Sequence, residues 1–312
     1  MSDVAQATSK RPLALNLALA VLGLADPTND PLVKLRLTGI RRRMGTAQKQ
    51  ARPLRFKGPV RDVERDAPRG LNVRTLLESC GGDLPGLRDR ALLSVAYDTG
   101  LRASELVAVE FSHIIEAIDP EARLLMIARS EGDQEGEGAT AYLSPRSVRA
   151  IAAWRAAARI EVGTIFSRVQ VRRYKARKAV PGRRIESISG REAWDLRKTL
   201  PRPAVAARIE YDVGQGALHP GSIGPIYRAI IQRAFDAGVL PDLTKDDLDR
   251  LLKGVSAHST RVGLNQDLFT SGEDLAGIMD ALRWKSPRMP LAYYRNLAAE
   301  HGAAGRLMTK ME

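Results

Sequence analysis

Apolar residues recur at helical spacing along most of the chain beyond residue 70, and short alternating runs interrupt them in one place. The helical pattern predicts helices over residues 73–80, 86–98, 104–110, 146–158, 221–237, 245–253 and 261–270. The alternating runs at 124–129 and 140–143 predict an antiparallel strand pair, joined by a polar turn over 130–139. The pattern therefore predicts a mainly α domain with a small antiparallel β-sheet.

The stretch before residue 70 predicts a separate, short helical domain over 1–50 and a linker over 51–70. Asp30 followed by Pro31 is typical of a helix start, and the helix that follows carries leucine and isoleucine on one broad side. A first helix over about 12–24 can pack against that side. The linker is assigned because its residues are rich in proline, glycine and charge and show no clear periodicity.

Residues 71–312 make up the second predicted domain, and a long insertion interrupts its helical pattern at about 161–219. The insertion is basic and shows no clear periodicity, with the dense run RRYKARK at 172–178. Long connections without secondary structure are uncommon inside a compact domain. We therefore expect an irregular, basic insertion on the protein surface.

The chain is strongly basic, with 49 Lys and Arg against 36 Asp and Glu in 312 residues and a formal net charge of +13. A surplus of this kind points to a polyanionic partner, although charge alone does not separate DNA, RNA and a membrane surface. Charge runs also commonly do no more than face water. The candidate contacts to a polyanion lie on the second N-terminal helix and in the insertion: Arg41, Arg42, Arg43, Lys49, Arg172, Arg173 and Lys175.

Cysteine and histidine usage predicts neither a disulfide nor a metal site. Cys80 is the single cysteine, and the four histidines show no HExxH spacing. We expect no cofactor and a reducing, cytoplasmic compartment. The apolar run at 13–25 follows two basic residues, as in a signal peptide, but it contains Asn16 and is too short to span a bilayer. We favour a helix there, and we expect no membrane partner.

Two helix starts carry the first candidate chemistry. Arg102 follows Gly100, which ends one helix, and begins the next, so its side chain is held beside backbone donors in a manner that suits an anion. Glu105 lies three residues further on. Far downstream, His258 and Arg261 place an imidazole and a guanidinium three residues apart on one helical face. Each of these pairs is a weak signal by itself.

A third piece completes an ordered set of residues. Trp284 follows Leu282 and Arg283, and Tyr293 comes nine residues after the tryptophan. The joint occurrence of the two helix-start pairs, this tryptophan and this tyrosine by chance is far rarer than that of any one piece. Tyr294 is adjacent and is the alternative tyrosine, but the spacing to Trp284 favours Tyr293.

The ordered set, and the passage HSTRVGLNQDLFTSGEDLAGIMDALRWKSPRMPLAYYRNL that contains most of it, resembles the tyrosine site-specific recombinases of the phage-integrase family. The resemblance is closest to the Cre-like branch, with Trp284 where many relatives have a second histidine. It runs from about Val73 to the C-terminus, apart from the insertion. It implies a mainly helical catalytic domain with a small antiparallel β-sheet, preceded by a helical domain that clamps DNA.

The resemblance also implies a reaction: one DNA strand at a time is cut and rejoined through a 3′-phosphotyrosine, without ATP or metal. Tyrosine forms an enzyme ester that conserves the bond energy, and arginine forks stabilise the charge that accumulates on the phosphate oxygens. By match to the family motif the catalytic residues are Arg102, His258, Arg261, Trp284 and Tyr293, with Glu105 in support. Trp284 as plain core and Glu105 as an ordinary helix ion pair remain open alternatives.

One position departs from the family pattern. The family has a lysine on the turn of the small sheet, where it protonates the leaving 5′ oxygen, and this chain has Glu131 there. A missing general acid lowers a rate by about 10²–10⁴. Three interpretations are open: Arg129 substitutes for the lysine, the turn is remodelled when the complex assembles, or the chain is a weakened relative that acts by binding DNA. A metal site formed by the acidic residues of the turn is a fourth, less favoured interpretation. We expect slow but real cleavage.

A second departure is the N-terminal domain, which has room for about two helices where the family uses four or more. Either the clamp is compact, or the chain begins inside a longer one. The resemblance implies double-stranded DNA at paired inverted half-sites and a homotetramer on recombining sites. The rivals are a catalytically silent DNA-binding relative, a type IB topoisomerase-like or telomere-resolving enzyme, and a plain basic nucleic-acid binder.

Overall fold

The computed structural model describes residues 29–44 (without the side chains of Arg41 and Met44), 50–58, 70–127, 138–182, 200–294, 307, 308 and 311. The chain divides into two units, Met1–Gln50 and Ala51–Glu312. In the first unit the described helix is α3 (Pro31–Met44). Its start is confirmed as expected, because the Asp30 carboxylate accepts a hydrogen bond from the Leu32 amide at 2.7 Å. The first helix expected at 12–24 lies outside the described residues.

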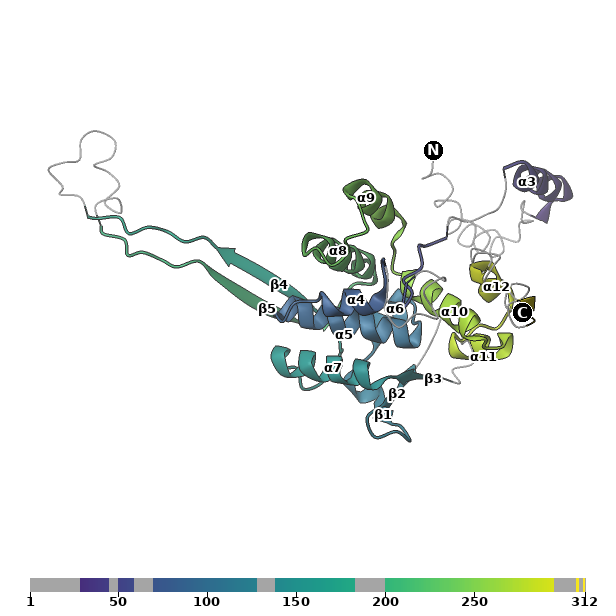
Figure 1. The fold of residues 1–312 in the computed structure, drawn as a ribbon, viewed down its shortest axis with the longest axis horizontal. Coiled ribbons are helices and arrows are strands. Elements are labelled where there is room, and N and C mark those ends of the chain that lie inside the picture. The colour runs from purple at the N-terminus through teal and green to yellow at the C-terminus, as the bar shows by residue number, and fades with distance from the viewer. Residues whose placement is uncertain are drawn as a thin grey trace, which may run out of the picture. The chain divides into compact units, whose positions relative to one another are not determined.

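The second unit is mainly helical, as the sequence predicts, and Figure 1 shows its helices around α5. Its helices are α4 (Val73–Glu78), α5 (Leu84–Thr99), α6 (Ala103–Ala108), α7 (Pro145–Ala158), α8 (Ile223–Asp236), α9 (Lys245–Gly254), α10 (Ser259–Ser271), α11 (Leu275–Ala281) and α12 (Arg288–Tyr294), with 3-10 turns η3 (Phe111–His113) and η7 (Pro220–Ser222). The periodicity did not predict α11 and α12, because seven residues are too few to show a helical repeat.

Helix α5 is the centre of this unit and is in contact with α4, α7, α8 and α10. The Asp83 carboxylate caps its start by accepting from the Gly86 amide at 3.0 Å, and Gly100 ends it with a left-handed φ of 55°. Residues 91–97 are all buried, so apolar side chains on every side of the helix meet neighbours. A helix of this kind fixes the position of whatever follows its C-terminal end.

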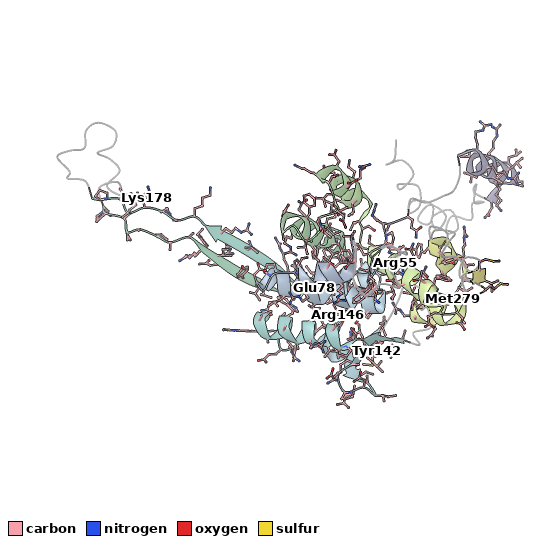
Figure 2. The ribbon with its side chains drawn as sticks, viewed as in Figure 1. Arg55, Glu78, Tyr142, Arg146, Lys178 and Met279 are labelled. Atoms are coloured by element: carbon pink, nitrogen blue, oxygen red, sulfur yellow. The ribbon has the colours of Figure 1, made fainter. Side chains whose placement is uncertain are left out.

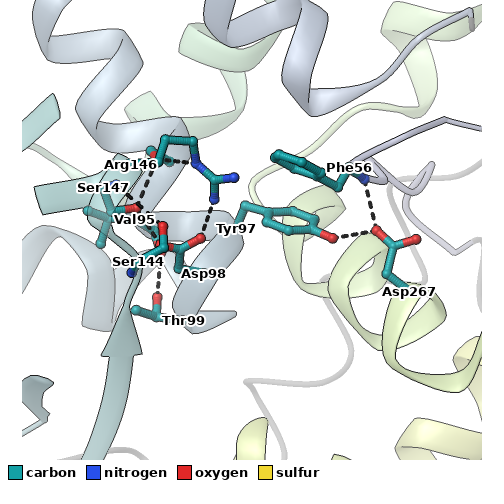
Figure 3. Close-up of polar contacts among 10 residues, drawn as sticks. Phe56, Val95, Tyr97, Asp98, Thr99, Ser144, Arg146, Ser147 and Asp267 are labelled. Carbon is teal, nitrogen blue, oxygen red and sulfur yellow. Dashed lines mark hydrogen bonds and ion pairs between the residues drawn. The ribbon is translucent and has the colours of Figure 1, made fainter. Parts of the chain in front are cut away.

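Asp98 and Asp267 each tie two segments together by side-chain hydrogen bonds (Figure 3). The Asp98 carboxylate accepts from the Ser144 amide at 2.9 Å and from the Ser147 hydroxyl at 2.5 Å, which joins the end of α5 to the start of α7. The Asp267 carboxylate accepts from the Phe56 amide at 2.8 Å and from the Tyr97 hydroxyl. Partly buried carboxylates that accept several hydrogen bonds favour one arrangement of the elements around them.

The small sheet is antiparallel and contains β1 (Ile114–Glu116), β2 (Arg123–Ile127) and β3 (Ala139–Leu143) in that order. The expected strand pair is confirmed as β2 and β3, which pair with Leu125 opposite Ala141. Strand β1 was not predicted, since three residues do not show an alternation. Residues 128–137, including Arg129 and Glu131, lie outside the described residues.

The insertion is the clearest difference from the expected structure. Instead of an irregular segment, its described part is a two-stranded antiparallel ribbon of β4 (Ser167–Tyr174) and β5 (Arg208–Ala217), which leaves the helical body in Figure 1. Bridges from Arg177 to Val205 and from Val180 to Arg202 extend the pairing. The inner part of the ribbon has apolar residues on one face, Val169 and Val171 in β4 and Ile209, Tyr211 and Val213 in β5. This alternation is short and lies among basic and polar residues, and the sequence analysis did not identify it.

The first part of the expected linker is also more ordered than its composition indicates. Leu54 is fully buried and its amide donates to the Ser259 carbonyl at 2.9 Å. The Arg55 guanidinium pairs with Asp267 at 2.6 Å. A β-carbon at Gly263 would lie 1.9 Å from the Leu54 carbonyl oxygen, so glycine is required for this approach. Residues 51–58 are therefore a packed part of the second unit. Because the main contacts come from single residues such as Leu54 and Arg55, the segment shows no repeating pattern in the sequence.

Within the described ranges, every helix is too short or too polar to cross a membrane.

Candidate active site

Arg102 is positioned by the turn that follows α5. It caps the N-terminus of α6, its amide donates to Glu105 Oε2 at 2.9 Å, and its guanidinium donates to Glu105 Oε1 at 2.6 Å. Burial acts to raise the pKa of Glu105, but hydrogen bonds from Arg102 and the charges of Arg102 and Arg283 outweigh it and leave the pKa below its ordinary value. Glu105 is therefore an ionised carboxylate that fixes the Arg102 side chain.

Arg261 lies on the first turn of α10, and only 1% of its surface is exposed. Its guanidinium donates to the carbonyl oxygens of Gly100 and Leu282, which joins the ends of α5 and α11. Burial, and next the charge of Arg102, lower its pKa to about 10, so the side chain keeps its proton at neutral pH. Because two backbone carbonyls hold the fork, its orientation is set before any ligand arrives.

Gly100 permits this arrangement. A β-carbon there would lie 2.3 Å from Leu282 Cδ2, and the left-handed φ of 55° is one that side chains rarely adopt. Glycine therefore lets the end of α5 adopt this backbone conformation and meet the end of α11 without displacing the Leu282 side chain.

His258, Trp284 and Tyr293 form an aromatic group beside Arg261. The Tyr293 ring centre lies 5.6 Å from that of Trp284 and 6.2 Å from that of His258. The Arg261 guanidinium carbon lies 4.8 Å from the Trp284 ring centre, which is within cation–π range. Three separate elements, α10, the end of α11 and α12, thus contribute to one cluster.

Burial shifts the pKa values of the two titratable rings of this cluster in opposite directions, and in both it favours the neutral form. The pKa of His258 is lowered by burial and then by the charges of Arg261 and Arg102, so its neutral form is favoured. The pKa of Tyr293 is raised by burial, and the same two arginines act in the opposite direction. At neutral pH a protonated phenol therefore lies beside a neutral imidazole.

Two amide side chains of α10 hold α12 in place. Asn265 donates to the Pro290 carbonyl at 3.2 Å, and Gln266 donates to the Tyr293 carbonyl at 3.1 Å. The neighbouring Tyr294 packs its ring on Phe269 at 4.4 Å between centres and makes no described ring contact with His258 or Trp284. The adjacent tyrosines therefore have different surroundings, and Tyr293 is the one beside the arginines.

Arg283 is a member of the cluster that the sequence did not identify. Its φ of 54° is left-handed, and 10% of its side chain is exposed. Nη1 donates to the Thr99 carbonyl at 3.2 Å, while Nη2 lies 3.6 Å from Glu105 Oε2 and, like Nε, has no hydrogen-bond partner. The position of Arg283 next to Trp284 in the sequence was the one indication of its place in the cluster, but an arginine beside a tryptophan is not a distinctive motif.

The remaining candidates belong to the first unit, to the ribbon or to residues that the structure does not describe. Arg42 and Arg43 are exposed on α3 of the first unit, and Arg172, Arg173 and Lys175 are exposed on the ribbon. The side chain of Arg41, and Lys49 and Glu131, lie outside the described residues. In the part of the chain that the structure describes, no three His, Cys, Asp or Glu residues gather as metal ligands.

The class of site follows from these contacts. Two arginines with fixed forks, a neutral histidine, an indole and a buried tyrosine meet at the C-terminal end of a core helix in a mainly helical protein. Such a set has donors for a phosphate group and one oxygen nucleophile, and its carboxylate, Glu105, is already paired. The cluster is suited to chemistry at a phosphate ester.

Part of this chain is similar in sequence to a known protein. The chain is 29% identical over 173 residues to the "Integrase/recombinase xerD homolog" of Selenomonas ruminantium, a match that covers 52% of this chain and 46% of that protein. The chain thus spans less than half of this relative's length. No protein-family model matches it.

Two solved structures are similar at low identity. A XerA recombinase crystal structure has a TM-score of 0.47 at 15% identity, covering 99% of this chain and 78% of the other. A XerH site-specific recombinase bound to a palindromic difH substrate, in a post-cleavage complex, has a TM-score of 0.46 at 12% identity, covering 77% and 52%.

Proposed function

We propose that this protein is a tyrosine recombinase, which cuts and rejoins duplex DNA through a covalent 3′-phosphotyrosine. The observation that carries the proposal is the burial of Tyr293 between His258 and Trp284, beside the fixed guanidinium of Arg261. The named relative from Selenomonas ruminantium and the strongly basic composition support it.

In this mechanism Arg102 and Arg261 hold the two non-bridging oxygens of the scissile phosphate. Negative charge grows on these oxygens in the transition state, and donors that are already oriented stabilise it without reorganisation. Glu105 fixes Arg102 by two hydrogen bonds, and the carbonyls of Gly100 and Leu282 fix Arg261. The indole N–H of Trp284 is a further donor to the phosphate.

The nucleophile is the Tyr293 oxygen. Its raised pKa means that the phenol is protonated before reaction, so a base must remove the proton as the bond to phosphorus forms. His258 has its pKa lowered and is therefore in the neutral form that can accept this proton. The bond from phosphorus to the 5′ oxygen breaks, and that oxygen takes up a proton; the reverse sequence rejoins the strand.

The proton donor to the 5′ oxygen is the weak point of the mechanism. Glu131 stands where the family has its lysine, between the sequences of β2 and β3, and a carboxylate close to the phosphate would repel it. Arg129 is close in sequence, but arginine keeps its proton and is a poor general acid. We therefore propose slow cleavage rather than none.

The wider assignment follows the same resemblance. We propose double-stranded DNA at paired inverted half-sites as substrate, a homotetramer on recombining sites, membership of the Cre-like branch and a cytoplasmic location, with no metal or cofactor required. The second candidate is a recombinase-fold protein that binds DNA without cutting it, which Glu131 favours. Product topology separates the cutting enzymes: recombinants, relaxed circles or hairpin ends.

A trapping experiment tests the proposal. The probe is a phosphorothiolate duplex carrying the site that the wild-type protein selects from random DNA, since its sulfur leaves without needing a proton. We expect an SDS-resistant adduct that Tyr293→Phe abolishes and Tyr294→Phe, the matched control, retains. On ordinary DNA, Glu131→Lys should raise the rate by about 10²-fold or more. A wild-type chain that binds the phosphorothiolate duplex but forms no adduct would establish the silent alternative instead.

A further inference from the structure

The ribbon of β4 and β5 is a second exposed basic element, separate from the catalytic cluster. All described residues at 170–182 and 200–210 are exposed, and Figure 2 shows Lys178 far out along the ribbon. A two-stranded ribbon that no other layer covers is only marginally stable in water. A binding partner that covers the ribbon would therefore stabilise it.

Charge identifies the partner. The described ribbon residues, 167–182 and 200–217, contain eight Lys and Arg but only two carboxylates, Glu210 and Asp212, for a net formal charge of +6. Two copies of such a ribbon repel each other, whereas a duplex presents about one negative charge per 1.7 Å of its axis. A two-stranded ribbon also has dimensions that the major groove admits.

The strand register separates the two faces of the ribbon. Residues directly opposite one another share a face, and Arg172 lies opposite Glu210 while Arg173 lies opposite Ile209. Arg177 pairs with Val205 further out. On one face, therefore, Arg173, Lys175 and Arg177 follow at two-residue spacing, and neither arginine faces a carboxylate across the ribbon.

The other face is partly neutralised by the chain itself. The Arg208 guanidinium pairs with Glu210 at 3.1 Å and lies 4.7 Å from the centre of the Tyr174 ring. The three cations Arg173, Lys175 and Arg177, which we call the open cations, lie on the face where the described ribbon has no carboxylate, since Glu210 and Asp212 both lie on the other face.

The base of the ribbon lies at the far end of α5 from the catalytic cluster. The Tyr211 hydroxyl contacts Asp83, the N-cap of α5, at 3.4 Å, whereas Arg261 binds the Gly100 carbonyl at the other end. A helix of 16 residues is about 24 Å long. That length corresponds to about seven base pairs, and Figure 1 shows the ribbon directed away from α10 to α12.

We propose that the ribbon is an accessory DNA arm whose open cations contact phosphates of the duplex at least about seven base pairs from the phosphate held by Arg261. The proposal rests on the proposed DNA-binding function, but it does not require the protein to cut DNA. The ten residues of β5 reach about 34 Å, which is close to one turn of duplex.

The experiment measures the salt dependence of binding to a 40-base-pair duplex of random sequence, by fluorescence anisotropy on the full chain. The variant is Arg173→Gln, Lys175→Gln and Arg177→Gln together. The matched control is Arg149→Gln, Arg208→Gln and Arg250→Gln, which removes the same charge from three exposed arginines that already pair with Glu121, Glu210 and Asp247.

Loss of three phosphate contacts lowers the slope of log K against log salt by about 2.7. Raising the salt from 50 to 200 mM should then weaken the wild-type chain about 40-fold more than the variant, with a much smaller difference for the control. Arg177→Gln alone should lower the slope by about 0.9, which keeps the test valid if the triple variant unfolds.

Equal slopes for wild type and variant overturn the proposal, as does an equal loss in the control, which would show that only net charge matters. If the variant instead abolishes self-association in sedimentation with its slope unchanged, the ribbon contacts a second copy and the DNA arm is wrong. These results are independent of adduct formation, so a failure here differs from a failure of the proposed recombinase activity.

Discussion

The catalytic cluster and the ribbon use arginine in opposite ways. Arg102, Arg261 and Arg283 contact atoms of their own chain, and each guanidinium has its direction set by a carboxylate or a carbonyl. Arg173 and Arg177 on the ribbon are exposed, and each faces an apolar residue across the strands. The first arrangement suits a ligand that must be held at one angle; the second suits contacts to a repeating charge, where many positions are equivalent.

The same contrast appears in what each region requires from its neighbours. The cluster needs close backbone approaches, a left-handed glycine and carbonyl acceptors from two helix ends. The ribbon needs only its own cross-strand hydrogen bonds and a contact at its base. Substitutions in the cluster should therefore affect chemistry, and those at its close backbone approaches should affect folding as well, whereas substitutions in the ribbon should affect binding and its salt dependence.

The largest effect is expected for Arg261→Lys, which keeps the charge but loses the fork. A lysine cannot hold both the Gly100 and Leu282 carbonyls while contacting a phosphate. We expect the rate of adduct formation on the phosphorothiolate duplex to fall about 10²–10³-fold in single-turnover assays. Arg250→Lys on α9 is the control, since Arg250 is exposed. A loss below about tenfold in a folded Arg261→Lys protein contradicts an oriented fork.

Gly100→Ala should have the next largest effect, on stability. The substitution adds left-handed strain of about 1–2 kcal/mol and a further 1–3 kcal/mol for the contact with Leu282. Gly272→Ala at the end of α10 is the control, because its φ of 91° is strained as well but its β-carbon would meet nothing within 4 Å. The free energies of unfolding of the two variants, measured in urea, should differ by about 1–3 kcal/mol. Equal losses would show that the Leu282 side chain moves aside at little cost.

Arg283 offers the smallest and most selective test. Arg283→Gly relieves left-handed strain but loses the hydrogen bond to the Thr99 carbonyl, and because these two effects oppose one another the free energy of unfolding should change little. The value of kcat should fall about tenfold because Glu105 loses one of its two cations. Arg283→Lys keeps the charge and should restore part of the rate. KM should change less than kcat if Arg283 acts through Glu105 and not on DNA.

The pH profile distinguishes this positioning role from a structural one. The pKa of Glu105 is below its ordinary value in the folded protein, so the carboxylate contributes above the unfolded pKa and its contribution is lost as pH falls through the folded pKa. Without Arg283 the folded pKa rises toward its ordinary value. The acid limb of the cleavage rate should therefore move to higher pH in Arg283→Gly, and an unmoved limb would argue against coupling between the two residues.

The sequence predicted those parts of the fold that repeat a pattern or sit at a helix end. The long helices, the β2–β3 pair and the glycine that ends α5 were all visible, because each depends on local spacing or on a residue with special backbone freedom. The placement of Arg102, His258, Arg261, Trp284 and Tyr293 in one region also followed the order of the motifs.

The parts that were missed depend on contacts between distant segments. Arg283 becomes part of the site only because α11 ends beside Glu105, and its sequence neighbours give no sign of this. The ribbon was predicted to be irregular because its apolar alternation is short: two valines in β4 and three residues, Ile209, Tyr211 and Val213, in β5, among basic and polar neighbours. Leu54 and Arg55 looked like linker because a single leucine and a single ion pair leave no repeat to detect.

The packing of residues 51–58 decides where an independent fragment of this chain can start. A fragment that begins at residue 71, where the helical pattern starts, would leave the Gly263 face of α10 uncovered and remove Arg55 from Asp267. It would also lose the backbone bonds from Arg52 and Leu54 to Gly254 and Ser259, which bracket the loop carrying His258. The smallest self-sufficient fragment therefore begins no later than Ala51, twenty-two residues before the first helix of the second unit, which begins at Val73.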